Sequence, residues 1–185
     1  MKKVTFRAAM IGTAVVSGFL TAVSAVMDHF LSMPWLFSLA ITFGTTFYHF
    51  AVRLLIGSLI PNRFDYRTFW FREKPFEKHL YRKLKLRRWK GQMPTYDPRL
   101  FSLEEYSLEQ ILRHTCQAEV VHEVIILFSF LPLLFSRFWG AFPVFLITSL
   151  AAAGFDTLFV LLQRYNRPRL VHLMKKQQKK GTHHV

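Results

Sequence analysis

Apolar residues gather in four runs along the chain, and each run is long enough to cross a lipid bilayer. They lie at about residues 8–27, 35–60, 120–138 and 141–162. A helix that spans a membrane needs roughly 20 mostly apolar residues. The pattern therefore predicts an all-α integral membrane protein with about four transmembrane helices.

The stretch between the second and third runs, residues 62–118, has a different character, with most of the charge and many aromatic residues. Within it, residues 77–90 predict a basic amphipathic helix with Leu80, Leu84 and Trp89 on its apolar side. Basic helices of this kind lie in the membrane interface. We therefore expect an interfacial helical region between the second and third spans.

Two local signals predict helix ends. Ser102 as a cap, with Glu104 and Glu105 in the first turn after it, predicts a helix start. Pro168 disfavours a helical conformation for the residue before it, which predicts the end of the fourth membrane helix there. We expect a single membrane domain over residues 1–170 and a flexible basic tail over residues 171–185.

The chain of 185 residues carries a formal net charge of +14 and is 51% hydrophobic. A basic excess can indicate nucleic-acid binding. Here the charge lies next to membrane runs, so lipid headgroups and topology explain it, and we expect no nucleic-acid partner. The single cysteine, Cys116, excludes an intramolecular disulfide and makes a cysteine zinc site improbable.

The distribution of positive charge also predicts orientation. Basic residues precede the first span and dominate residues 62–118 and the tail, whereas the connection at 28–33 has no Lys or Arg. Four spans with both termini and the middle region on the cytoplasmic side of the cell membrane satisfy this pattern. The first run is longer than the core of a typical signal peptide, so we expect it to be a retained helix.

Ionisable residues also lie inside or at the ends of the apolar runs: His49, Arg53, Glu119, His122 and Asp156. Such residues are costly in lipid and usually point into a bundle. Glu119 and His122 are three apart and share a helix face, as do His49 and Arg53 at four apart. The residues alone leave two interpretations open, ion pairs that hold the bundle together or a His–carboxylate catalytic unit. Glu119 and His122 form only half of a di-iron motif, so we predict no metal.

A run rich in arginine, Gln163-Arg164-Tyr165-Asn166-Arg167-Pro168-Arg169-Leu170, follows the fourth span directly. Arginine suits bidentate recognition of phosphate or carboxylate. Arginines at a cytoplasmic helix end also serve as plain topology signals. Anchoring does not require Tyr165 and Asn166, so binding stays open beside it.

With these residues in view, the chain resembles the glycosyl-4,4′-diaponeurosporenoate acyltransferase family over about residues 64–170. The run at 163–170 carries the resemblance most specifically. Shorter matches are Ala118-Glu119 with His122, Arg88-Trp89-Lys90, and Tyr96-Asp97 with Arg99. The resemblance implies transfer of a fatty acyl group to a sugar hydroxyl of a membrane glycolipid, such as a carotenoid glycoside. It also implies acyl-CoA or another activated donor as co-substrate, and no further cofactor.

These considerations give a hypothesis for the site. His122, oriented by Glu119, deprotonates the sugar hydroxyl. We expect the donor and acceptor to contact Arg164, Tyr165, Asn166, Arg167, Arg169, Arg88, Trp89, Lys90, His49, Arg53 and Asp156, with Lys85 and Arg87 helping to dock the donor. Two other classes stay open from the residues, a small membrane methyltransferase or reductase and a non-catalytic subunit of a glycolipid pathway.

Overall fold

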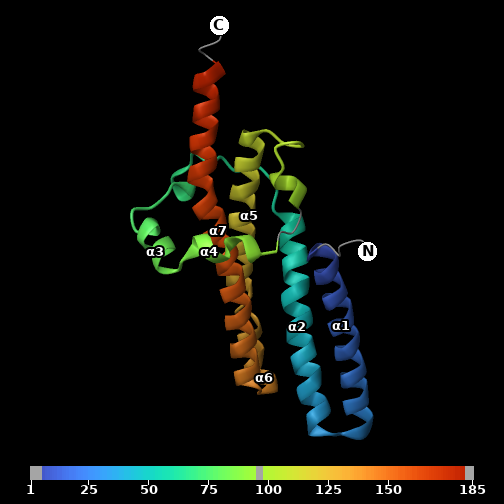
Figure 1. Cartoon of the computed structure of the whole chain (residues 1–185). Coiled ribbons are helices and arrows are strands. Elements are labelled where there is room, and N and C mark those ends of the chain that lie inside the picture. Colours follow the sequence, from blue (N-terminus) through green and yellow to red (C-terminus); the bar gives the residue numbers. More distant parts are fainter. Residues whose placement is uncertain (1–5, 95–97, 182–185) are drawn as a thin grey trace. The chain divides into compact units, whose positions relative to one another are not determined.

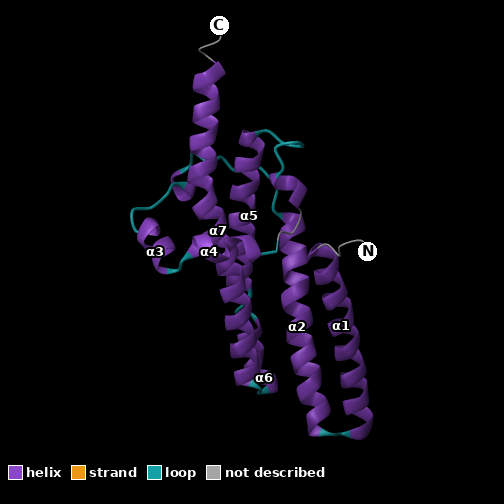
Figure 2. Ribbon diagram, in the orientation of Figure 1, coloured by secondary structure: helices purple, strands orange, loops and turns teal. Residues whose placement is uncertain are grey.

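The computed structural model describes residues 6–94 and 98–181, and within them it contains helices, turns and loops but no strand. Figure 2 shows this all-helical architecture. It confirms the fold class that the apolar pattern predicts. Three features of the sequence analysis lie outside the described residues: the first two lysines, Tyr96-Asp97, and the last four residues of the tail.

Within the part of the chain that the structure describes, four helical segments are long and apolar enough to cross a membrane, which makes the chain a multi-pass membrane protein by length and composition. They include α1 (Phe6–Leu31), α2 (Pro34–Leu59), α5 (Leu108–Phe128) with α6 (Pro132–Trp139), and α7 (Phe142–Gly181) (Figure 1). Between α2 and α5 lie shorter elements: η1 (Phe69–Phe71), α3 (Glu77–Lys83), α4 (Leu86–Trp89), η2 (Lys90–Gln92) and η3 (Pro98–Phe101).

The described residues pack as two compact units. Unit 1 comprises Met1–Leu59 and Glu123–Thr157, and unit 2 comprises Ile60–His122 and Leu158–Val185. In unit 1, α1 and α2 form an antiparallel hairpin (Figure 1). Large apolar side chains on its outside stay uncovered, among them Phe19 at 66% and Phe30 at 78% exposure. An apolar surface of this kind suits a lipid environment.

Among the described residues of unit 2, small apolar clusters fix its loops onto α5 and α7. In the first, Tyr66 and Phe71 pack on Leu112 and Cys116 of α5. In the second, Tyr81 of α3 and Leu86 of α4 pack on Leu162 of α7. The interfacial segment is therefore a packed part of unit 2.

The prediction that the fourth helix ends at Pro168 is wrong, because α7 continues through this proline to Gly181. Residues 171–181, expected as a flexible tail, are therefore helical. A proline inside a helix removes one backbone hydrogen bond and crowds the carbonyl four residues earlier. The neighbouring Arg164 and Arg167 are held by buried ion pairs, and these side-chain contacts keep the turn helical.

The expected basic helix at 77–90 is also divided. Lys85 adopts a left-handed backbone conformation with φ of 51°, which separates α3 from α4. The break turns Leu86 inward to 0% exposure, whereas Leu84, expected on the apolar side, is 40% exposed. The buried apolar residues of this segment are Tyr81 and Leu86, and Trp89 packs against them as predicted.

The start of α5 differs from the expected position as well. The residues after Ser102 form turns, and the helix begins at Leu108 after Ser107. Ser107 Oγ accepts a hydrogen bond from the Gln110 backbone N–H at 3.3 Å, and Gln110 Oε1 accepts one from the Ser107 N–H at 2.9 Å. This reciprocal capping box satisfies two otherwise free donors and sets the helix start.

The division at Lys85 gives a direct test of the packing in unit 2. Replacing Leu86 with Ala should lower the free energy of unfolding by about 2–5 kcal/mol, because a fully buried leucine leaves a cavity. Replacing the exposed Leu84 with Ala provides the matched control and should cost about 0.5 kcal/mol or less. Chemical denaturation of the purified protein in detergent measures both. Equal losses in the two variants would contradict the packing of Leu86.

Candidate functional site

The arginine-rich run on α7 presents its arginines to two different surroundings. Arg167 is 2% exposed and Arg164 has only 14% of its side chain exposed, and both face the interior of unit 2. Arg169 is exposed on the outside of the helix. Arg164 and Arg167 are three residues apart and so lie on one helix face. The run therefore has an inner pair and an outer residue with different partners.

The inner pair belongs to a buried cluster of four charges. Glu119 Oε1 accepts a hydrogen bond from Arg164 Nη1 at 2.5 Å, and Glu119 Oε2 accepts one from Arg167 Nη2 at 2.5 Å. Glu77 Oε1 accepts a hydrogen bond from Arg164 Nε at 2.8 Å. Two carboxylates and two guanidinium groups make the cluster electrically neutral. Glu119 is 0% exposed and Glu77 is 3% exposed, and charges buried to this extent require partners of opposite charge.

Backbone and hydroxyl oxygens take up the remaining donors of the two guanidinium groups. Arg167 donates to Thr115 Oγ1 at 3.2 Å, to the Thr115 carbonyl at 3.1 Å and to the Phe71 carbonyl at 3.2 Å. Arg164 donates to the carbonyls of Trp70 at 3.2 Å and Arg72 at 3.3 Å. These bonds tie α7 to α5 and to the segment around η1. Both guanidinium groups are thus used for internal contacts.

Glu77 is a member of this cluster that the sequence analysis missed, because it reads as the first residue of a solvated basic helix. Its second oxygen accepts a hydrogen bond from Tyr81 Oη at 2.8 Å, one turn further along α3. Burial, with the hydrogen bond to Glu77, raises the pKa of Tyr81 above its ordinary value. The signal in the sequence is the spacing of Glu77 and Tyr81, four residues apart on one helix face.

His122 lies one turn beyond Glu119 on α5, within unit 2. Its ring stacks on Phe159 of α7, with ring centroids 4.6 Å apart and an interplanar angle of 9°. The side chain is half-buried. Both oxygens of Glu119 accept hydrogen bonds from arginines of α7. This carboxylate therefore holds α5 against α7 one helix turn away from His122.

The other predicted residues inside the spans form a separate set in unit 1. Arg53 pairs with Asp156, and it also donates to the carbonyls of His49 at 2.8 Å and Ala152 at 3.1 Å. Asp156 is 1% exposed and His49 is 6% exposed. The buried Nε2 of His49 has no hydrogen-bond partner among the residues that the structure describes. The predicted site residues are thus brought together in two sets, one in each unit.

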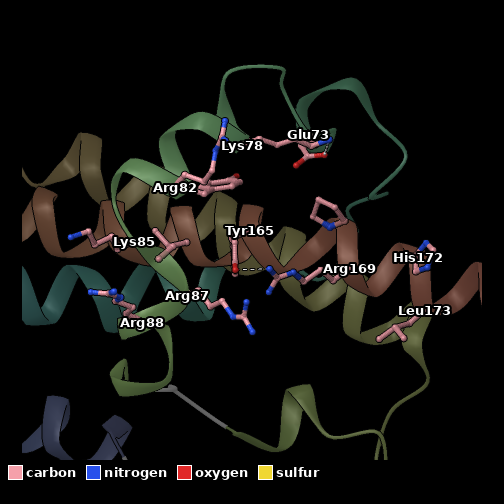
Figure 3. A pocket seen from close by; sticks show the side chains of 13 residues that line it. Glu73, Lys78, Arg82, Lys85, Arg87, Arg88, Tyr165, Arg169, His172 and Leu173 are labelled. Atoms are coloured by element: carbon pink, nitrogen blue, oxygen red, sulfur yellow. Dashed lines mark hydrogen bonds and ion pairs between the residues drawn. The ribbon is translucent and has the colours of Figure 1, made fainter.

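On the outside of unit 2, a surface pocket with a volume of 1190 Å³ lies between the α3–α4 segment and α7 (Figure 3). Leu86, Pro168, Leu173 and the Tyr165 ring supply an apolar part of its wall. Six cationic side chains and one carboxylate, that of Glu73, line the pocket. With His172 counted as neutral, the formal charge of the pocket is +5. The cations are Lys78, Arg82, Lys85, Arg87, Arg88 and Arg169.

Arg169 has a fixed place in this pocket. It donates a hydrogen bond to Tyr165 Oη at 2.5 Å, and its guanidinium carbon lies 3.9 Å from the centroid of the Tyr165 ring. Lys90 lies 5.3 Å from the same ring, and the Tyr81 ring meets it edge-on. Figure 3 shows Tyr165 and Arg169 together, with the cations of α3 and α4 around them. The pocket is therefore built around an arginine–tyrosine pair.

Two further predicted residues lie near this pocket. Trp89 packs against the cluster of Tyr81, Leu86 and Leu162, and its Nε1 donates to the Leu84 carbonyl at 3.0 Å. Asn166 is half-buried on α7, between the residues that face inward and those that face the pocket. Among the described residues, no group of three His, Cys, Asp or Glu side chains gathers as metal ligands.

Comparison with known proteins agrees with the distinctive run on α7. A family profile described as glycosyl-4,4′-diaponeurosporenoate acyltransferase matches residues 67–176, more than half of the chain. Two relatives with this name, from Staphylococcus aureus strains Newman and N315, are 30% and 29% identical over 143 residues. These matches cover 70% of this chain and 83% of each relative. No solved structure matches the chain. The chain therefore belongs to the glycosyl-4,4′-diaponeurosporenoate acyltransferase family and is an acyltransferase.

Proposed function

We propose that the chain transfers a fatty acyl group from an activated thioester donor to a sugar hydroxyl of a membrane glycolipid. The relatives are named for a glycosylated carotenoid acid, which supports a carotenoid glycoside as the acceptor. Membership in an acyltransferase family selects acyl transfer over methyl transfer, reduction and a non-catalytic role. The four membrane-spanning helices support an acceptor that is itself embedded in lipid.

The observation that carries the proposal is the place of His122 in unit 2. Its ring lies flat on Phe159 of α7, and the basic pocket begins at Tyr165 of the same helix. Six residues separate Phe159 from Tyr165, which is about 9 Å along a helix axis. A titratable ring and a pocket suited to an anionic donor therefore lie within two turns of α7.

The proposed reaction uses His122 as a general base. A ring nitrogen takes the proton of the sugar hydroxyl, and the hydroxyl oxygen attacks the thioester carbonyl. The resulting tetrahedral oxyanion collapses, the carbon–sulfur bond breaks, and the thiolate takes the proton back from His122. The products are a sugar ester and a free thiol. We assign the amide of Asn166 as the donor that stabilises the oxyanion.

Glu119, Arg164 and Arg167 act as positioning residues in this proposal. Each makes several buried hydrogen bonds to the others or to backbone carbonyls, so none is available as a substrate contact without breaking the cluster. Their bonds hold α5 against α7, and this contact sets the stack of His122 on Phe159. In unit 1, the unpartnered Nε2 of His49 supports a contact to the acceptor within the membrane, with Arg53 and Asp156 holding α2 and α7.

We also propose that both termini and unit 2 lie on the cytoplasmic side of the cell membrane. Basic side chains of α3, α4 and the end of α7 all belong to unit 2. Positive charge near the ends of spans favours the cytoplasmic side. Activated acyl donors are made in the cytoplasm, so this orientation gives them direct access.

The experiment that tests the function is mass analysis of glycolipids from cells that carry the chain and from matched cells that carry the His122→Ala variant. We expect a glycolipid with one acyl chain more in the first cells and its unacylated precursor in the second. Purified protein with a thioester donor and that precursor should then form the ester. Identical glycolipids in both cells, together with no ester formation by the purified protein, would contradict the proposal.

A further inference from the structure

We propose that the basic pocket of unit 2 binds the phosphate-bearing end of a coenzyme A thioester, which makes acyl-CoA the donor. The inference rests on the proposed acyl-transfer function, because it names the donor for that reaction. The chemistry that the pocket recognises is a cluster of phosphate groups attached to a nucleoside.

The charge of the pocket matches that of the coenzyme. Six cations and one carboxylate line it, a formal charge of +5. Coenzyme A carries a pyrophosphate and a 3′-phosphate, with a charge of about −4 near pH 7. Glu73 lies 3.7 Å from Lys78 and forms an ion pair there. Arginine is suited to bidentate phosphate recognition, and four of the six cations are arginines.

The cations of the pocket are exposed, in contrast to the inner pair of the same run. Lys78 has 74% of its side chain exposed, and Arg82, Arg87 and Arg88 are likewise exposed. Arg169 is held in place by Tyr165, so one phosphate contact is oriented before the ligand arrives. Such preorganisation lowers the entropic cost of binding.

The size of the pocket and the number of its cations favour a small molecule with several phosphates over a lipid headgroup. Its volume of 1190 Å³ compares with about 300–1,000 Å³ for sites that enclose small ligands. The exposed Leu173 and the Tyr165 ring offer apolar surface for the adenine and its ribose. A lipid headgroup usually presents a single phosphate, which leaves most of these cations without a partner.

The position of the pocket on α7 also agrees with binding of a water-soluble phosphate group. The helix is 40 residues long, about 60 Å, whereas the hydrocarbon core of a bilayer is about 30 Å thick. The apolar run ends at Leu162, and the pocket residues of α7 start at Tyr165. The phosphates would therefore lie in water, while the acyl chain of the thioester extends along α7 toward Phe159 and the lipid.

The test measures binding of coenzyme A itself, which has no acyl group and cannot react. The full chain is purified in an uncharged detergent, and binding is measured by equilibrium dialysis with labelled coenzyme A. The double variant Arg87→Gln and Arg88→Gln should bind at least about tenfold more weakly, since each lost arginine removes a charged hydrogen bond. The matched control is Lys175→Gln with Lys176→Gln, the same charge change on exposed cations of α7 outside the pocket, and its affinity should stay within about twofold.

Two further measurements identify the ligand. Dephospho-coenzyme A, which lacks the 3′-phosphate, should bind about tenfold more weakly than coenzyme A to the unchanged protein. Nanodiscs with and without phosphatidylglycerol should bind coenzyme A equally. Equal affinity of the pocket and control variants for coenzyme A would overturn the inference, as would loss of coenzyme A binding in the presence of phosphatidylglycerol, which would assign the pocket to lipid headgroups.

Transfer assays with acyl-CoA and with an acyl-carrier protein separate this inference from the proposed function. Transfer from the carrier protein alone, without binding of coenzyme A, overturns the donor assignment and leaves the proposed function standing. Binding of coenzyme A that depends on Arg87 and Arg88, without transfer from either donor, supports the pocket assignment and overturns the proposed function.

Discussion

Replacing Glu119 with Gln is expected to lower the free energy of unfolding of this chain by about 3–5 kcal/mol. The change keeps the size of the side chain and removes one of the two carboxylates from a cluster that is neutral. Glu77 still pairs with Arg164, but the buried Arg167 loses the carboxylate that compensates its charge. Thermal and chemical unfolding in detergent, followed by the helical circular dichroism signal, measure the loss.

A matched variant shows whether the loss of stability comes from the buried cluster or from any Glu→Gln change on α5. Glu109 lies on the same helix with 52% of its side chain exposed, where it pairs with Arg113. Exposed ion pairs contribute about 0–1 kcal/mol, so Glu109→Gln should leave the unfolding transition nearly unchanged. If the two variants unfold alike, the cluster does not stabilise unit 2.

A second substitution tests the charge balance itself. Adding Arg167→Met to Glu119→Gln leaves one carboxylate and one guanidinium group, which restores neutrality. The double variant should therefore unfold at a higher temperature than Glu119→Gln alone, although it has lost more hydrogen bonds. The reverse order would show that the individual bonds of Arg167 to Thr115 and Phe71, rather than charge balance, dominate.

Replacing His122 with Ala should lower kcat/KM for acyl transfer by about 10²–10⁴-fold, the usual contribution of a general base. The ring is half-buried and stacks on Phe159, and we expect the variant to stay folded. Binding of coenzyme A should also be unchanged, because His122 does not line the basic pocket. This combination distinguishes a catalytic role from a structural one.

The control for this variant is His114→Ala on the same helix. His114 Nδ1 lies 3.0 Å from Asn62 Nδ2, and its ring meets Tyr106 edge-on. We expect this variant to keep its activity and to lose some stability. An unchanged rate in the His122→Ala variant would remove this histidine from the mechanism.

Several features of the molecule could be predicted from the sequence because they depend on local composition. Runs of about 20 apolar residues identify a membrane helix without knowledge of its neighbours, so four spans follow directly. The separation of basic and apolar segments, and the distinctive arginine-rich run, are equally local. They sufficed to identify the family, and they placed Glu119 and His122 on one face of one helix.

The partners of these residues depended on tertiary packing. The distance along the chain between Glu119 and Arg164 gives no sign that their side chains meet. Spacing on α5 predicted only that Glu119 and His122 share a helix face. Glu77 reads as a solvated residue until α3 packs against α7. An arginine of the run faces inward when its side of α7 packs against α5, and it faces the pocket when that side is exposed.

The places where helices end or continue also depend on both local sequence and tertiary packing. Pro168 predicts a helix end from local rules, and buried ion pairs on its neighbours override that preference. Lys85 carries no local signal for a left-handed conformation, which follows from the burial of Leu86 against α7. The membrane helices, the basic character and the family of this protein follow from composition and short spacing, which the amino-acid order contains directly. Which charges pair inside and which face the pocket follows from the folded chain alone, because pairing depends on contacts between helices far apart in the chain.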